Sequence, residues 1–151
     1  MGGNLEVAPD GKAPTFLVGA LKDSYSGNLD RIQIVKGWLN ADGTTAEMIF
    51  DIACAGRAIV DHKCDGAVGN TVDVENATWT NSIGSPELIT VWTDPGFDPA
   101  LRAVYYVRVI EIPTPRWTAY EAKYFGVEAP AESPMITQER AYTSPIWYTP
   151  G

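Results

Sequence analysis

The residues best suited to chemistry lie in one irregular loop, Ala55–Gly69, and at the strand end before it. Cys54, His62, Cys64 and an aspartate, Asp61 or Asp65, could supply four tetrahedral ligands to zinc. However, structural zinc sites favour two close cysteines on a tight knuckle, and this cysteine spacing matches no common zinc finger or ribbon. A disulfide closing a loop of about ten residues is therefore favoured over zinc, with free thiols as the remaining alternative.

Motifs for nucleophilic or phosphate chemistry are weak. His62 is the single histidine, no G-x-S-x-G motif is present, and no local motif places a serine beside the imidazole. The segment Gly66–Asn70 lacks the lysine and the following helix of a phosphate-binding loop. The nineteen Asp and Glu residues offer carboxylate pairs, but any acidic domain does. We therefore expect no catalytic residues, no metal and no cofactor in this chain alone.

The aromatic residues suggest a possible binding surface. Five tryptophans could stack against sugar rings as in carbohydrate-binding modules, although filling the core is the more common role of such side chains. They are Trp38, Trp79, Trp92, Trp117 and Trp147. Arg116 and Trp117 follow a Pro-framed turn, which suits an anion, a partner surface or a local cation–π contact. We predict that this pair, together with Trp38, Lys36 and Arg108, forms a partner or ligand surface.

Charge and hydropathy limit the partners. The net charge is −8, and the eleven Lys and Arg residues are scattered, whereas nucleic-acid binding needs a basic face. No apolar run approaches the roughly 18 residues that a membrane helix needs, so neither nucleic acid nor membrane is an expected partner. Because Met1–Glu6 has neither a basic start nor an apolar core, we expect any signal peptide to lie upstream.

The element that organises the chain is Ala100–Thr114, its longest run of β-branched and aromatic residues. From residue 101 to 109 the odd-numbered positions form an unbroken apolar face, whereas the even-numbered face is mixed and expected to be only partly covered. This pattern predicts a strand in the middle of a sheet, ended by two prolines that cannot donate to a ladder.

Shorter elements surround this strand. Asn40–Gly43 predicts a hairpin turn, and an alternation slip at Ile34–Val35 suggests a β-bulge. Arg116–Phe125 has a helical pattern that ends at Gly126. The other predicted strands are Thr15–Leu21, Arg31–Leu39, Thr45–Cys54, Thr71–Trp79, Glu87–Thr93 and Arg140–Tyr148.

Seven short strands and one short helix near 116–125 predict an all-β fold, specifically a seven-stranded antiparallel β-sandwich of immunoglobulin or fibronectin type. The spacing of Tyr105, Val107 and Val109 after a Pro- and Asp-containing turn resembles the tyrosine corner of such domains. A small barrel is the alternative. Residues 1–13, rich in Gly, Pro and Asp, are expected to be a linker or N-terminal loop, and residues 14–151 the sandwich domain.

Four phrases resemble the C-terminal portion of an uncharacterised bacterial protein family. They are L-D-R-I-Q-I-V-K-G-W (29–38), V-G-N-T-V-D-V (68–74), F-D-P-A-L-R-A-V-Y-Y-V-R-V-I-E-I-P-T-P-R-W (97–117) and Q-E-R-A-Y-T-S-P-I-W-Y (138–148). Full-length members of that family are several times longer and often exported, and their N-terminal part resembles metal-dependent phosphoesterases of the polymerase-and-histidinol-phosphatase type. The resemblance implies that Cys54 pairs with Cys64, because exported members carry cysteines here.

The resemblance also implies where chemistry would lie in the parent protein. Phosphoesterases of that type gather His and Asp ligands around metal ions from an H-x-H motif, whereas this chain has no such motif and only His62. We therefore expect a non-catalytic C-terminal accessory domain that packs against the upstream domain of a larger, exported, hydrolase-like protein. This reading implies a periplasmic or extracellular location.

Two other functions are possible from the sequence. An independent glycan- or small-anion-binding module would need at least two exposed, coplanar tryptophans in a groove. A zinc-dependent catalyst would need the loop residues around His62 to hold a metal ion. The accessory domain instead predicts an exposed apolar patch larger than a monomer usually tolerates.

Overall fold

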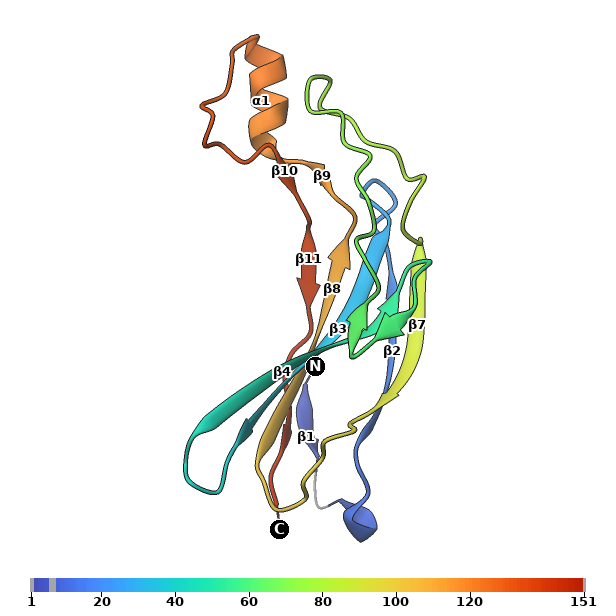
Figure 1. Cartoon of the computed structure of the whole chain (residues 1–151), viewed down its shortest axis with the longest axis vertical. Helices are drawn as coiled ribbons and strands as arrows, with labels where there is room; N and C mark the ends of the chain where they lie inside the picture. The colour runs from blue at the N-terminus through green and yellow to red at the C-terminus, as the bar shows by residue number, and fades with distance from the viewer. Residues whose placement is uncertain (1, 6–7, 151) are drawn as a thin grey trace.

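The computed structural model describes residues 2–5 and 8–150, and these residues form mainly β-strands (Figure 1). The predicted all-β class is thus confirmed, whereas residues 1, 6 and 7 of the predicted N-terminal loop lie outside the described residues. The strands are β1 (Gly3–Leu5), β2 (Thr15–Leu21), β3 (Leu29–Leu39), β4 (Thr45–Cys54), β5 (Ile59–Val60), β6 (Lys63–Cys64), β7 (Glu87–Thr93), β8 (Ala103–Glu111), β9 (Thr114–Pro115), β10 (Ile136–Thr137), β11 (Arg140–Tyr142) and β12 (Ile146–Tyr148). A 3-10 turn, η1, spans Pro9–Gly11, and the helix α1 spans Trp117–Phe125.

The largest sheet has six strands, and β8 lies in its middle. Its order is β1-β12-β8-β3-β4, and β11 pairs with β8 on the same edge as β12. The predicted organising strand therefore has neighbours on both edges. The prediction of a purely antiparallel sheet is wrong at one edge. There β1 runs parallel to β12, with Gly3 opposite Ile146 and Leu5 opposite Tyr148.

The hairpin of β3 and β4 follows the sequence pattern closely. Gly43 takes a positive φ of 84° in the predicted turn, a conformation that glycine adopts without steric cost. A register shift between the two strands occurs at Ile32 and Gln33, so the irregularity lies slightly before the predicted position at Ile34–Val35. The extra residue is Ile52 on β4, whereas Ile32 and Ile34 lie two positions apart on β3 and share the core face, where each is almost fully buried.

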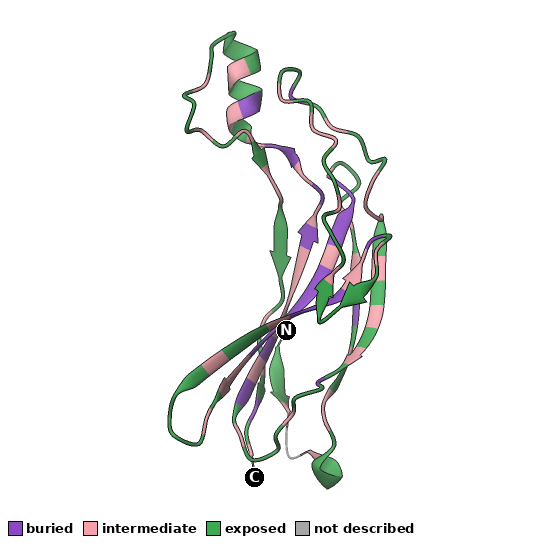
Figure 2. Ribbon diagram, viewed as in Figure 1, coloured by how far each residue is buried: buried purple, intermediate pink, exposed green. Residues whose placement is uncertain are grey.

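A second layer covers one face of the large sheet. Strands β2 and β7 form a separate two-stranded antiparallel ribbon, with Phe16 opposite Trp92. The inner face of this ribbon packs on the large sheet, where it contributes to the main core. The buried members of that core are Val18, Ile32, Ile34, Phe50, Ile52, Ala103, Tyr105 and Tyr148. Figure 2 shows buried residues (purple) on the central strands of the large sheet.

The helix α1 lies at one end of the molecule, beyond β9 and β10 (Figure 1). As predicted, it ends at Gly126, which takes the left-handed conformation with φ of 63° and donates its N–H to the carbonyl of Ala122. Ala119 is the one residue of this helix that is buried, so α1 contributes little to the core.

Two predicted strands differ from the structure. Thr71–Trp79 is a looped segment with one isolated bridge between Asp73 and Thr78, because polar side chains bond to nearby backbone there. Arg140–Tyr148 is split into β11 and β12 by the segment that contains Pro145, which cannot donate to a ladder. The sheets are open, and the two-layer packing is compatible with a sandwich.

Candidate functional site

The predicted reactive loop is closed by a disulfide. Cys54 at the end of β4 and Cys64 on β6 are bonded, with their Cα atoms 5.7 Å apart. This is the alternative favoured above over zinc and over free thiols. Although Asp51 and both sulfur atoms lie within 4.8 Å of one another, bonded sulfurs offer no thiolate to a metal.

His62 takes a structural position in this loop. Its ring meets the ring of Phe50 edge-to-face, with 5.0 Å between the ring centroids. Its backbone carbonyl accepts a hydrogen bond from the N–H of Asp51 at 2.8 Å, and this bond ties the loop to the edge of β4. The loop thus covers an otherwise open strand edge.

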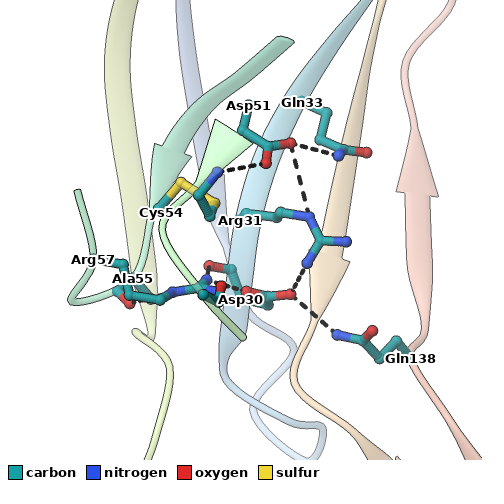
Figure 3. The surroundings of a disulfide bond; sticks show 10 residues. Asp30, Arg31, Gln33, Asp51, Cys54, Ala55, Arg57 and Gln138 are labelled. Atoms are coloured by element: carbon teal, nitrogen blue, oxygen red, sulfur yellow. Dashed lines mark hydrogen bonds and ion pairs between the residues drawn. A yellow bond between two sulfur atoms is a disulfide. The ribbon is translucent and has the colours of Figure 1, made fainter. Parts of the chain in front are cut away.

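A buried carboxylate lies beside the disulfide (Figure 3). Asp30 on β3 is fully buried, and its carboxylate pairs with the guanidinium groups of Arg31 and Arg57. Gln138 also donates to it at 3.1 Å. A buried charge is stable only when it is paired and hydrogen-bonded, and Asp30 meets that condition with donors from separate segments of the chain. This cluster holds the turn between β4 and β5 and the segment before β11 against β3.

A second polar chain runs across the sheet from the disulfide. Asp51 accepts hydrogen bonds from the backbone N–H of Cys64 at 2.8 Å and from Gln33 at 2.5 Å (Figure 3). Gln33 in turn accepts a bond from the Nε atom of Arg108 at 2.7 Å. Arg108, predicted as part of a partner surface, is therefore engaged within the domain and half-buried.

Lys36 was predicted to lie on an exposed surface, but the structure buries it. It is 5% exposed, and its Nζ atom lies 2.6 Å from Oδ2 of Asp94. The Tyr105 hydroxyl donates to the same oxygen at 2.7 Å, and Lys36 also donates to the carbonyl of Gly96 at 2.7 Å. Lys36 lies on the same face of β3 as Ile32 and Ile34, so it points into the core. The sequence alone did not identify Asp94 as its partner.

Burial and the hydrogen bond to Asp94 raise the pKa of Tyr105 well above its ordinary value. The phenol therefore stays protonated and acts as a hydrogen-bond donor rather than as a base. Every buried side-chain nitrogen and oxygen in the described part of the chain has a hydrogen-bond partner. The hydrogen-bonding capacity of the buried polar clusters is thus satisfied within the domain, and such clusters hold strands and loops together.

Arg116 and Trp117 form the local cation–π contact that the sequence allowed. The guanidinium carbon lies 5.6 Å from the centroid of the indole ring, and Trp117 remains 58% exposed. Trp38 lies elsewhere, with the Nζ atom of Lys36 5.3 Å from its ring and its own N–H donated to Asn40. The five predicted surface residues therefore do not form one surface.

A groove lies on the face of the large sheet opposite the ribbon. It has a volume of about 550 Å³ and a mostly apolar lining, which includes Gly37, Val104 and Trp147. Gly37 leaves the groove open, because a Cβ atom there would lie 3.2 Å from Val104. Trp147 is 52% exposed, whereas Trp117 lines a separate hollow beside α1. The two exposed tryptophans therefore do not share one groove.

One exposed apolar surface was not predicted from the sequence. The outer face of the β2–β7 ribbon carries Leu17, Leu21, Ile89 and Val91, each more than 60% exposed, with Leu17 opposite Val91 and Gly19 opposite Ile89. We call these four residues the ribbon face. The inner face of the same ribbon is also apolar, so both strands are hydrophobic at consecutive positions, the signature of strands covered on both sides.

The geometry defines an open, two-layer β domain. Its buried polar groups bond to one another and to the backbone, and these contacts stabilise the fold. The chain belongs to the family described as "Protein of unknown function (DUF3604)", whose family model matches residues 1–150. Neither the search of curated proteins nor that of solved structures found a match. No helix in the described part of the chain has the length and hydropathy needed to cross a membrane.

Proposed function

We propose that this chain is a non-catalytic accessory domain that packs against another domain of a larger, exported, hydrolase-like protein. The observation that carries the proposal is the ribbon face. Four large aliphatic side chains on two paired strands would be left in water in the isolated domain, and contiguous apolar patches of this kind mark interaction sites. Burial would recover about 25 cal/mol for each Å² of apolar surface removed from water.

The helix α1 offers a second apolar surface in support. Trp117, Tyr124 and Phe125 are all more than half exposed, although aromatic side chains favour burial. A helix of nine residues is marginal in water on its own, because isolated helices shorter than about 12–15 residues rarely form. Contact with a neighbouring domain would stabilise it.

The resemblance to long, exported bacterial proteins supports the identity of the neighbour. In that view the hydrolase-like, phosphoesterase-type domain precedes this one in the parent chain. A disulfide between Cys54 and Cys64 suits the oxidising conditions outside the cytoplasm, which supports a periplasmic or extracellular location.

We also keep the immunoglobulin-like sandwich as a proposal for the fold class. Two packed layers support it, whereas the Tyr105 hydroxyl bonds to the side chain of Asp94 and not to backbone, as a tyrosine corner would. The six-stranded sheet with a parallel edge pair is its main departure from the expected seven-stranded arrangement.

The experiment is carbene footprinting of this chain and of the longer protein encoded by its full reading frame. We expect strong labelling of Leu17 and Val91 in this chain and at least about fivefold less in the longer protein, because burial removes the probe's access. The exposed Tyr25, on the turn after β2, serves as an internal reference. Equal labelling of the ribbon face in both proteins would remove the accessory proposal.

A second candidate is a glycan- or small-anion-binding module that uses one exposed tryptophan instead of the expected coplanar pair, favoured specifically by the groove around Trp147. An exposed indole beside an open apolar floor can stack against a sugar ring. Screening on a glycan array followed by isothermal titration calorimetry tests it, with Trp147→Ala as the variant and Trp117→Ala as the matched exposed control. Binding that both variants retain would exclude this groove.

A further inference from the structure

The outer edge of β2 is open. Among the described residues, β2 pairs only with β7, and no backbone hydrogen bond joins Thr15–Leu21 to any other element. A strand paired on one edge presents a row of N–H and C=O groups on the other. Two devices that protect natural edges, charged side chains and proline, are absent from Thr15–Leu21.

The ribbon lies over the large sheet in a defined order. Trp92 of β7 contacts Phe50 of β4, with 5.0 Å between ring centroids, and Phe16 of β2 contacts Tyr105 of β8 at 5.1 Å. Strand β7 therefore lies over β4, and β2 lies nearer β8. The open edge of β2 consequently faces the β8–β11 side of the large sheet (Figure 1).

The sheet beyond that edge is apolar and incompletely covered. Val107 and Val109 of β8 point toward the core face but are only half-buried, whereas Tyr105 on the same face is 2% exposed. Ala141 of β11 is directly opposite Val109, so it shares this face, and it is exposed. We call Val107, Val109 and Ala141 the uncovered floor. The second layer thus stops one strand short of covering the sheet.

We infer that the open edge of β2 and the uncovered floor together form a strand-addition site for an extended, uncharged peptide segment from the neighbouring domain. This inference rests on the proposed function and names how that neighbour attaches. Backbone groups of the added strand would pair with β2, and its alternate side chains would cover Val107, Val109 and Ala141. The site is continuous with the ribbon face, because both belong to β2.

The net charge of the chain favours a peptide segment of the neighbouring domain over a second copy of the chain as the occupant of this site. Each copy carries a net charge of −8, so two copies repel each other. The edge and the floor carry no charge, so they complement a segment with small or β-branched uncharged side chains at alternate positions.

The test uses a fluorescein-labelled peptide of alternating threonine and valine, with a lysine at each end for solubility, and fluorescence anisotropy. We expect saturable binding by the 151-residue chain. A peptide N-methylated along one edge should still bind through its other edge, whereas a peptide N-methylated along both edges should not bind. Equal binding of all three peptides would indicate hydrophobic adsorption and would overturn the inference.

Two protein variants locate the site. Ala141→Lys places a charge in the uncovered floor and should weaken binding at least about tenfold. Ala131→Lys, a matched exposed alanine in the loop after α1, should leave binding unchanged. Circular dichroism shows whether both variants fold. If the folded chain binds no peptide, the strand-addition site is refuted but the ribbon face remains available to the proposed neighbour. If sedimentation shows a dimer that Ala141→Lys dissociates, the occupant of this site is a second copy and the inference fails.

Discussion

The hydroxyl of Tyr105 donates a hydrogen bond to Oδ2 of Asp94 at 2.7 Å, inside the main core. Lys36 pairs with the same oxygen, and the N–H of Gly96 donates to the other carboxylate oxygen at 2.9 Å. One carboxylate therefore connects β3, β8 and the turn after β7. This turn carries the chain from the ribbon to the large sheet, so the cluster anchors one layer to the other.

Tyr105→Phe should lower the free energy of unfolding at neutral pH by about 1–3 kcal/mol, because the buried carboxylate loses a donor. The pKa of Tyr105 is raised in the folded protein, mainly by burial, so its contribution is full below the ordinary tyrosine pKa of about 10 and declines as the pH rises above it. The wild type should therefore lose stability more steeply above pH 10 than the variant does. Urea unfolding at a series of pH values measures both slopes.

Tyr25→Phe is the matched control for this experiment. Tyr25 is 93% exposed, so its replacement should change the free energy of unfolding by less than about 0.5 kcal/mol. Parallel pH slopes for the wild type and Tyr105→Phe would contradict the assigned role of the phenol.

Lys36→Met should lower the free energy of unfolding by about 3–5 kcal/mol, because it leaves the Asp94 carboxylate buried without its cation. The double variant Lys36→Met with Asp94→Asn should recover much of that loss, since the neutral amide can still bond to Tyr105. Urea unfolding of the two single variants and the double variant completes the cycle. Simple additivity of the two single losses would show that the pair is not coupled.

Replacing both cysteines, Cys54→Ser with Cys64→Ser, should lower the free energy of unfolding by about 2–3 kcal/mol, the value for a loop of this length. Reductant should destabilise the wild type by a similar amount and leave the double variant unaffected. Denaturant unfolding with and without dithiothreitol provides the measurement. A wild type that is insensitive to reductant, with its disulfide shown to be reduced by mass, would contradict this expectation.

Leu17→Lys combined with Val91→Glu should reduce binding of a hydrophobic dye and raise solubility, because the pair removes half of the ribbon face. The free energy of unfolding should change by less than about 0.5 kcal/mol, since both side chains are exposed. The matched inner pair, Phe16→Lys with Trp92→Glu, should unfold the domain. A large loss of stability from the outer pair would show that these residues are buried in solution.

The local elements could be predicted where backbone preference and side-chain period agreed. The bounds of β2, β4 and β7 match the predicted ranges, because β-branched and apolar runs there are ended by Pro, Gly and Asp. Thr71–Trp79 has a similar composition but no regular pairing. Asn70 and Asp73 bond to nearby backbone N–H groups, and Ala77 takes a positive φ of 47°, so local turns replace the strand.

Which side chains are exposed and which are buried was harder to predict than where the strands lie. Lys36 was predicted to lie on a partner or ligand surface, but it is buried beside Asp94, a partner that lies far away in sequence. The ribbon face was missed because apolar residues at consecutive positions do not say which face meets the large sheet. Only the packing of Phe16 and Trp92 resolves that choice.

The parallel pairing of β1 with β12 gives the domain a particular mechanical property. A force that separates the two chain ends would pull Gly3–Leu5 and Ile146–Tyr148 in opposite directions along their common axis. The hydrogen bonds between them would then be loaded in shear, all at once, rather than opened one by one as in a zipper. Resistance to stretching is therefore concentrated where the two ends of the described chain meet.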